Sequence, residues 1–243
     1  MNFLNNLHPV TKNLLLINVI LFIITVFGEQ QGFPITHYLG GHVFSSPFFQ
    51  PYQLVTHFFM HGSLMHLVGN MFGLVFFGNL LERVWGPKRF FIFYFVTGIG
   101  AFVLYQGIGY YELLQVREEI TLLGYNYHDV HHLLSEGKVY TNAGPKMTEY
   151  VQMLSVPMIG ASGAVFGILA AAAYLFPNME IMLIFFPVPI KAKYFVSIYL
   201  VYEVIQTIQY NPTDNIAHLA HIAGALIGFI MVKIWQKSRT NFY

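Results

Sequence analysis

Residues 156–176 read VPMIGASGAVFGILAAAAYLF and contain no charged side chain. About 20 mostly apolar residues are enough to cross the hydrocarbon core of a bilayer as a helix. The run therefore predicts a membrane-spanning helix, with Pro157 in the first turn, where a proline is well tolerated. Ser162 then lies about 8 Å below the start of that helix, at a rise of 1.5 Å per residue.

Five other segments have the same character, and the composition agrees with them. Hydrophobic residues make up 56% of the 243 residues and charged residues only 9%, whereas soluble domains carry about 25% charged residues. The surplus apolar surface must therefore face lipid. The sequence predicts an all-α membrane protein, a single domain over residues 1–243, with six transmembrane helices near Val10–Phe27, Phe58–Leu81, Phe90–Gly109, Val156–Phe176, Pro189–Tyr210 and Ile216–Trp235.

Two long connections, residues 28–56 and 110–155, join these segments. The first contains no Lys or Arg; the second is polar, with apolar residues at helical spacing over Glu112–Leu123. We expect the first span to be retained rather than cleaved as a signal peptide, because only Lys12 precedes its apolar part and no small-residue cleavage site follows Phe27.

The distribution of cations predicts the orientation. Nine of the 12 Lys and Arg residues fall in the N-terminus, the tail and two alternate connections: Lys12, Arg83, Lys88, Arg89, Lys191, Lys193, Lys233, Lys237 and Arg239. The positive-inside rule then places both termini in the cytoplasm. No targeting signal is apparent, so we expect a bacterial inner membrane, with residues 28–56 and 110–155 on the outer face.

The remaining bulk properties exclude several classes of function. A net charge of +1 gives no basic field for nucleic acid. The absence of cysteine excludes disulfides, thiolate metal sites and a cysteine nucleophile. The lipid bilayer is the partner that the composition indicates, and no oligomeric state follows from it.

Two clusters of polar residues beside glycines stand out, because polar groups within a bilayer are costly. Ser162 lies between Gly160 and Gly163, and Gly163 and Gly167 form a face of small residues that permits close helix contact. His221 lies beside Ala220 and Gly224, at a similar expected depth of about 8 Å in the sixth span. Helix packing alone explains either cluster singly; together they predict a serine and a base within hydrogen-bonding reach. His218, one turn earlier, competes for the role of base.

A third cluster, His57, His61, His66 and Asn70, falls around the outer half of the second span. His66 and Asn70 are four residues apart and share one helix face, from which both can donate hydrogen bonds to an oxyanion. His57 and His61 have a spacing found in metal ligands, but no carboxylate or cysteine stands near them, so we expect neither a metal nor a cofactor. His128, His131 and His132 form a further group that we interpret as surface histidines, with opportunistic metal capture as the alternative.

These clusters carry a resemblance to a known family. The stretch HFFMHGSLMHLVGNM at residues 57–71 resembles the second-helix signature of rhomboid intramembrane proteases. Gly160-Ala161-Ser162-Gly163 is similar to their nucleophile motif, and Ala220-His221-Ile222-Ala223-Gly224 to their sixth-helix motif. Glu82-Arg83, followed by Gly86 and Phe90, resembles the turn after their second helix. The signals occur in the family's order over residues 57–228.

The resemblance implies a six-helix bundle that hydrolyses peptide bonds in or near transmembrane segments of other membrane proteins. It implies a Ser–His dyad without an acidic third member, in which His221 takes the proton of Ser162. His66, Asn70 and the Ser162 backbone N–H would stabilise the oxyanion, with Gly160, Gly163, Phe166, His61 and Gly224 in supporting positions. Residues 28–56 would lie partly in the membrane, and the fifth span with a cap near residues 211–215 would move to admit substrate.

Some positions depart from the family pattern. Phe166 stands where many relatives have Tyr, which keeps an aromatic face for His221 but loses the hydroxyl. Tyr52-Gln53 stands where some relatives have Trp-Arg. Glu203 is expected to pair inside the bundle rather than to catalyse, and to lie close to the outer surface.

Two other classes of function compete with proteolysis. One is a non-proteolytic rhomboid-like protein that binds and escorts membrane proteins; the presence of both Ser162 and His221 argues against it. The other is a histidine-rich metal permease, which would need carboxylates in several spans, whereas Glu203 alone lies well inside one.

Overall fold

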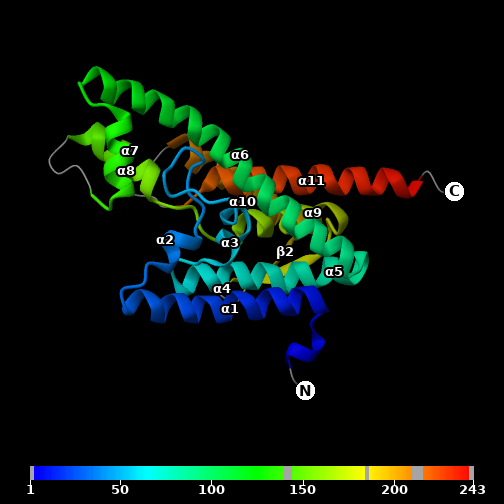
Figure 1. The fold of residues 1–243 in the computed structure, drawn as a ribbon. Helices are drawn as coiled ribbons and strands as arrows, with labels where there is room; N and C mark the ends of the chain where they lie inside the picture. The colour runs from blue at the N-terminus through cyan, green and yellow to red at the C-terminus, as the bar shows by residue number, and fades with distance from the viewer. Residues whose placement is uncertain (1–2, 139–143, 184–185, 210–215, 241–243) are drawn as a thin grey trace.

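We describe residues 3–138, 144–183, 186–209 and 216–240 of a computed structural model of the protein (Figure 1). The predicted cap near residues 211–215 lies outside this part of the chain. The elements follow one another as a 3₁₀ turn Phe3–Asn6, α1 Pro9–Gln30, α2 Ile35–Leu39, α3 Gln53–Thr56, a 3₁₀ turn His57–Phe59, α4 Leu64–Gly73, a π-helical turn Leu74–Gly78, α5 Asn79–Trp85, α6 Pro87–Leu122, α7 Tyr127–Ser135, α8 Pro145–Ser155, α9 Ser162–Leu175, β1 Glu180–Leu183, β2 Phe186–Lys191, α10 Ala192–Gln209 and α11 His218–Thr240.

Four helical segments of the described chain are long and apolar enough to cross a membrane: Pro9–Gln30, Leu64–Trp85, Pro87–Leu122 and His218–Gln236. The protein is thus a mostly helical integral membrane protein. The apolar helix α9 has 14 residues, and α10 carries Lys193 and Glu203 in its 18 residues. Each of the six predicted spans overlaps a helical segment of the structure, and four of these segments have the length and hydropathy of a membrane span.

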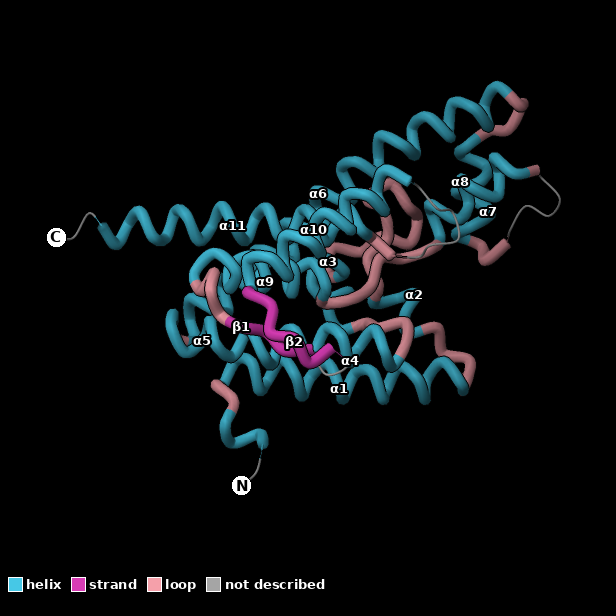
Figure 2. The backbone as a smooth tube through the Cα atoms, turned by 180° about the vertical axis from the view of Figure 1, so that it is seen from behind, coloured by secondary structure: helices cyan, strands magenta, loops and turns pink. Residues whose placement is uncertain are grey.

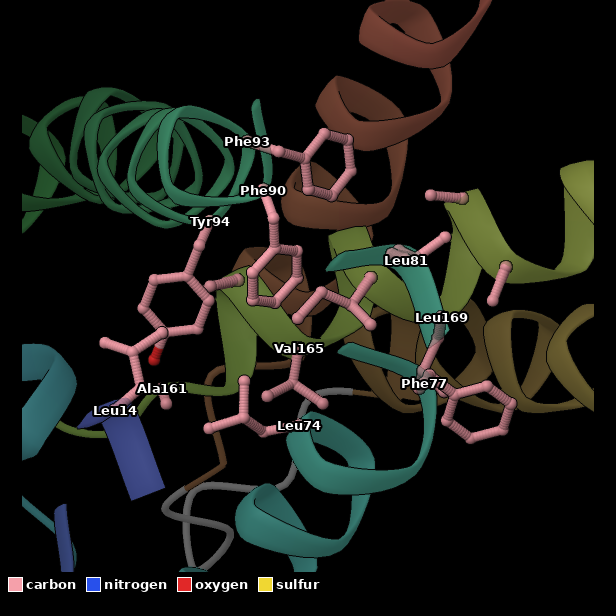
Figure 3. Packing of buried hydrophobic residues seen from close by; sticks show 14 of the residues in the cluster. Leu14, Leu74, Phe77, Leu81, Phe90, Phe93, Tyr94, Ala161, Val165 and Leu169 are labelled. Carbon is pink, nitrogen blue, oxygen red and sulfur yellow. The ribbon is translucent and has the colours of Figure 1, made fainter. Parts of the chain in front are cut away.

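Helix α9 occupies the centre of the molecule, and every residue from Gly163 to Ala172 is buried. It contacts α6, α11, α10 and α4, while α1 runs beside α4 at one side of the molecule (Figures 1 and 2). Figure 3 shows Val165 and Leu169 of α9 among the side chains of the main core, with Leu74 and Phe77 from the π-helical turn nearby. Small residues on α9 let its neighbours approach from several sides.

A buried carboxylate ties the start of α1 to α5. Glu82 accepts hydrogen bonds from the backbone N–H groups of Val10 and Thr11, at 2.9 and 2.8 Å, and from the Thr11 hydroxyl at 2.8 Å. A negative charge at a helix N-terminus satisfies free N–H groups and opposes the positive end of the helix dipole. Gly86, at φ 79°, then makes the predicted turn into α6.

The start of α1 and the end of α11 lie at the same end of the molecule, away from α7 and α8 (Figures 1 and 2). At the α7 end, α6 extends beyond the main core and forms a second core with α7 and α8, around Ile120, Val130 and Tyr150. Helical spacing over Glu112–Leu123 is therefore confirmed as a continuation of α6. The histidines of α7 lie at its surface: His128 and His132 are exposed, and His131 lies 3.1 Å from the Tyr150 hydroxyl.

The all-α prediction omitted one small element. Strands β1 and β2 form an antiparallel hairpin that pairs Glu180 with Lys191 and Ile181 with Ile190. Pro187 and Pro189 disfavour a helix in this segment, so α10 begins at Ala192 rather than at the predicted Pro189.

Candidate active site at the start of α9

The fourth predicted span begins later than expected, and this changes the position of Ser162. Helix α9 starts at Ser162 itself, not near Pro157. The preceding residues are extended: Met158 pairs with Gly41 as an isolated β-bridge, and the Gly160 N–H donates to the His57 carbonyl at 2.9 Å. Gly160 has φ 113°, a conformation that residues with a side chain rarely adopt. Because this φ is not helical, α9 cannot extend backwards through Gly160. The prediction that Ser162 lies 8 Å along the helix from its first residue is therefore wrong.

A serine at the first position of a helix has a distinctive environment. The first N–H groups of α9 have no partner within the helix, and the helix dipole places partial positive charge there. Ser162 is half-buried, and its hydroxyl makes no hydrogen bond within the part of the protein that the structure describes. The predicted hydrogen bond between Ser162 and His221 is thus not formed in the described part of the chain; His221 hydrogen-bonds to Glu203.

His221 lies in the first turn of α11, which begins at His218 rather than at the predicted Ile216. The Phe166 ring, one turn after Ser162, stacks on the imidazole with ring centroids 4.2 Å apart and an angle of 8° between planes. His221 is only 8% exposed. The stacking holds the imidazole beside the first turn of α9, where Ser162 lies.

Two glycine contacts bring α9 and α11 together at backbone distance. A Cβ atom added at Gly224 would collide with the Gly163 carbonyl oxygen, and one added at Gly228 would lie 2.7 Å from the Gly167 Cα. Real Cβ atoms do not approach so closely, so any larger residue at either position must push the helices apart. The predicted close approach of the two small-residue faces is confirmed.

The predicted oxyanion donors lie on the other side of Ser162. His66 and Asn70 share a face of α4, and the Asn70 amide donates to the His66 carbonyl at 2.9 Å. A Cβ atom at Gly160 would lie 2.7 Å from His66 Nε2, so this ring reaches the backbone just before Ser162. His66 also lies within electrostatic reach of His221. The structure therefore brings His66, Ser162 and His221 into one neighbourhood.

His57 and His61 precede α4 instead of lying within it, so the predicted start of the second span at Phe58 is wrong. The helix begins at Leu64, where the Ser63 hydroxyl caps it by accepting from the His66 N–H at 3.1 Å. Without a shared helix, the four-residue spacing of His57 and His61 no longer indicates a metal pair. The His61 ring instead packs edge-on against His66, with centroids 5.0 Å apart, and burial together with His66 lowers the pKa of His61 to about 4.

Sequence reasoning missed the partners of Glu203. This α10 carboxylate is 1% exposed, and its Oε2 lies 2.9 Å from His221 Nδ1 and 2.6 Å from His218 Nδ1. The available signal was a single acidic residue well inside an apolar helix, followed by two histidines three residues apart in the next helix. Within the described chain, this trio is the one group of three whose ligand atoms, all within 4.8 Å of one another, could hold a metal ion.

A comparison with family models identifies the family of the chain. A rhomboid domain model matches residues 49–238, which is most of the chain and includes α4, α9, α10 and α11. The chain belongs to the rhomboid family. The match contains the motifs at Ser162 and His221 on which the resemblance rests.

Curated relatives of this rhomboid chain are distant. RHOMBOID-like protein 12, mitochondrial, of Arabidopsis thaliana is 27% identical over 191 residues, covering 79% of this chain and 48% of the relative. Rhomboid protein 1, mitochondrial, of Saccharomyces cerevisiae is 26% identical over 183 residues, covering 74% of this chain and 42% of the relative. The chain thus spans about half the length of these two proteins.

Proposed function

We propose that this rhomboid chain is an intramembrane serine endopeptidase that hydrolyses peptide bonds in or near transmembrane segments of other membrane proteins. Two contacts carry the proposal: the Gly163–Gly224 contact and the Phe166–His221 stack bring the base beside a helix that starts at Ser162. A serine needs an adjacent base to become a nucleophile.

The proposed reaction assigns one role to each of these groups. Ser162 Oγ attacks the substrate carbonyl carbon while its proton passes to His221 Nε2, and the same proton then moves to the leaving amine as the C–N bond breaks. Water repeats the sequence on the acyl-enzyme and regenerates the serine. Hydrogen bonds from the Ser162 N–H, His66 and Asn70 would stabilise the oxyanion of each tetrahedral intermediate.

The membrane setting completes the proposal. Six helices, α1, α4–α5, α6, α9, α10 and α11, would cross the bilayer, with both termini in the cytoplasm and the site opening to the opposite face. The start of α1 and the end of α11 lie at the same end of the molecule, which supports an even number of membrane crossings. The names of the curated relatives include the word mitochondrial. A mitochondrial membrane is therefore a second candidate location, besides the bacterial inner membrane predicted from the sequence. Membrane fractionation of the native cell separates the two.

The deciding experiment is cleavage of a transmembrane reporter by purified protein in detergent or liposomes. We expect wild type to cleave and Ser162→Ala and His221→Ala to be inactive, while Ser135→Ala, at the exposed end of α7, cleaves normally. Circular dichroism and gel filtration check that each variant is folded. Cleavage by folded Ser162→Ala at the wild-type rate would eliminate the serine mechanism.

A chelator arm tests the metal alternative. Activity that is lost in Ser162→Ala and unchanged by chelator supports the serine protease, because the Glu203–His218–His221 group then works without a bound ion. Activity lost only to chelator would assign that group to a metal. No cleavage of several reporters, combined with stable capture of membrane proteins by wild type, would favour the non-proteolytic escort function.

A further inference from the structure

Glu203 is a buried carboxylate whose hydrogen-bonding partners identify a role. An ionised carboxylate only accepts hydrogen bonds, so the imidazole groups 2.9 and 2.6 Å from its Oε2 must donate from Nδ1. A neutral histidine carries one ring proton, and the nitrogen that carries it is set by the partner of the other nitrogen. His221 with its proton on Nδ1 therefore has a lone pair on Nε2.

We propose that Glu203 is the positioning residue of the active site, which holds His221 in the Nδ1–H tautomer and orients Nε2 for the proton of Ser162. This inference rests on the proposed protease function and deepens it. It replaces the acid-free dyad implied by the family resemblance with a Ser162–His221–Glu203 relay of hydrogen bonds, whose acidic member comes from α10.

The packing around the imidazole leaves one nitrogen free for chemistry. Phe166 covers one face of the ring, and Glu203 occupies the Nδ1 edge. Nε2 is therefore the nitrogen that can reach a reacting hydroxyl. Fixing both the plane and the edge of the ring removes rotations that would otherwise misdirect the lone pair.

The carboxylate also balances charge during the reaction. When Nε2 takes the Ser162 proton, the ring becomes a cation that keeps its Nδ1–H bond to Glu203, and the carboxylate itself takes no proton. Glu203 is 1% exposed, so little water screens the attraction between its carboxylate and the imidazolium of His221. Stabilisation that arises only as the cation forms raises kcat rather than substrate affinity.

His218 holds the carboxylate in place. Its Nδ1 donates to the same Oε2 from one turn earlier on α11. Among the described residues, the other titratable groups around His221 and Glu203 are His66 on α4 and Tyr199 and Tyr202 on α10. Glu203 is the one carboxylate among these described neighbours.

The kinetic test compares two buried glutamates. Glu203→Gln removes the charge at the site, whereas the matched control Glu82→Gln removes an equally buried charge that caps α1. We expect Glu203→Gln to lower kcat about 10²-fold or more with KM little changed, by analogy with loss of the acid from a catalytic triad. Glu203→Asp should recover part of the rate, and Glu82→Gln should keep the wild-type kcat.

A measurement of the folded fraction separates positioning from a structural role. Misfolding of Glu203→Gln would reduce the amount of active protein, whereas lost positioning lowers kcat in protein that is fully folded. Wild-type kcat in folded Glu203→Gln overturns the inference.

A measurement on the wild-type protein keeps the inference separate from the protease function. In ¹⁵N-histidine NMR at neutral pH, we expect His221, assigned by its loss in His221→Gln, to be protonated at Nδ1 and bare at Nε2. The opposite tautomer overturns the inference whether or not the protein cleaves. Failure of wild type to cleave, with the Nδ1–H tautomer present, overturns the proposed function alone.

Discussion

The aromatic ring of Phe166 lies parallel to the imidazole of His221, with centroids 4.2 Å apart. Phe166 projects from α9 and His221 from α11, so the stack fixes the ring relative to the helix that begins at Ser162.

Removing the aromatic face should therefore reduce the rate. We expect Phe166→Leu to lower kcat about 10-fold or more, because an imidazole free to tilt places its lone pair less often toward Ser162, and Phe166→Tyr to remain within a factor of about 3. Phe229→Leu, two turns further along α11 and packed against Tyr174, is the control. Equal kcat values for Phe166→Leu and wild type would show that the stack does not orient the base.

The oxyanion donors should show partial redundancy. Asn70→Ala should retain measurable cleavage, because His66 and the Ser162 N–H still donate, while His66→Ala combined with Asn70→Ala should lose about 10²–10³-fold or more in kcat. Single-turnover cleavage measures both. Full activity in the folded double variant would remove these two side chains from the mechanism.

The contact between α9 and α11 should be intolerant of one added methyl group. We expect Gly224→Ala to lower the free energy of unfolding in detergent by about 1–3 kcal/mol or more, as overpacking does. Gly69→Ala on α4 is the matched control, because a Cβ there meets nothing within 4 Å; alanine should stabilise that helix by up to about 1 kcal/mol. Similar thermal midpoints for the two variants would contradict the close backbone contact.

Stability should depend on pH through His57, which precedes α4. Burial lowers the pKa of His57 from 6.5 to about 4, opposed in part by the 2.6 Å hydrogen bond from its Nδ1 to the Gln53 carbonyl. The unfolded chain thus binds the proton more readily between these values, so stability is complete above pH 6.5 and falls as the pH drops toward 4. One pKa unit corresponds to about 1.4 kcal/mol.

The matched variant is His57→Phe, which keeps the ring packing against Phe102 but cannot take a proton. Its thermal midpoint should change less steeply between pH 6.5 and 4 than that of wild type. Parallel slopes for the two proteins would assign the acid sensitivity to other groups.

The sequence allowed prediction of the membrane class, the helices and the neighbourhood of Ser162 and His221, because apolar length and small-residue faces are local patterns. The start of α9 could not be predicted in this way. It depends on pairing of Met158 with Gly41 and of Gly160 with His57, residues far away in the chain. The start of α4 had a local signal, the Ser63 cap, which the prediction did not use. The Glu203 contact was likewise hidden, since the rotation of α10 relative to α11 leaves no periodic signal.

The extended backbone before Ser162 has a consequence for transplanting this site. Its two anchors, Gly41 and His57, precede the serine by more than 100 positions. A graft of α9 into another scaffold would thus carry the serine but not the geometry that presents it. The smallest part of the chain that preserves this geometry is α9 together with the segment from Gly41 to His57. In recombination between family members, these two segments should therefore come from the same parent.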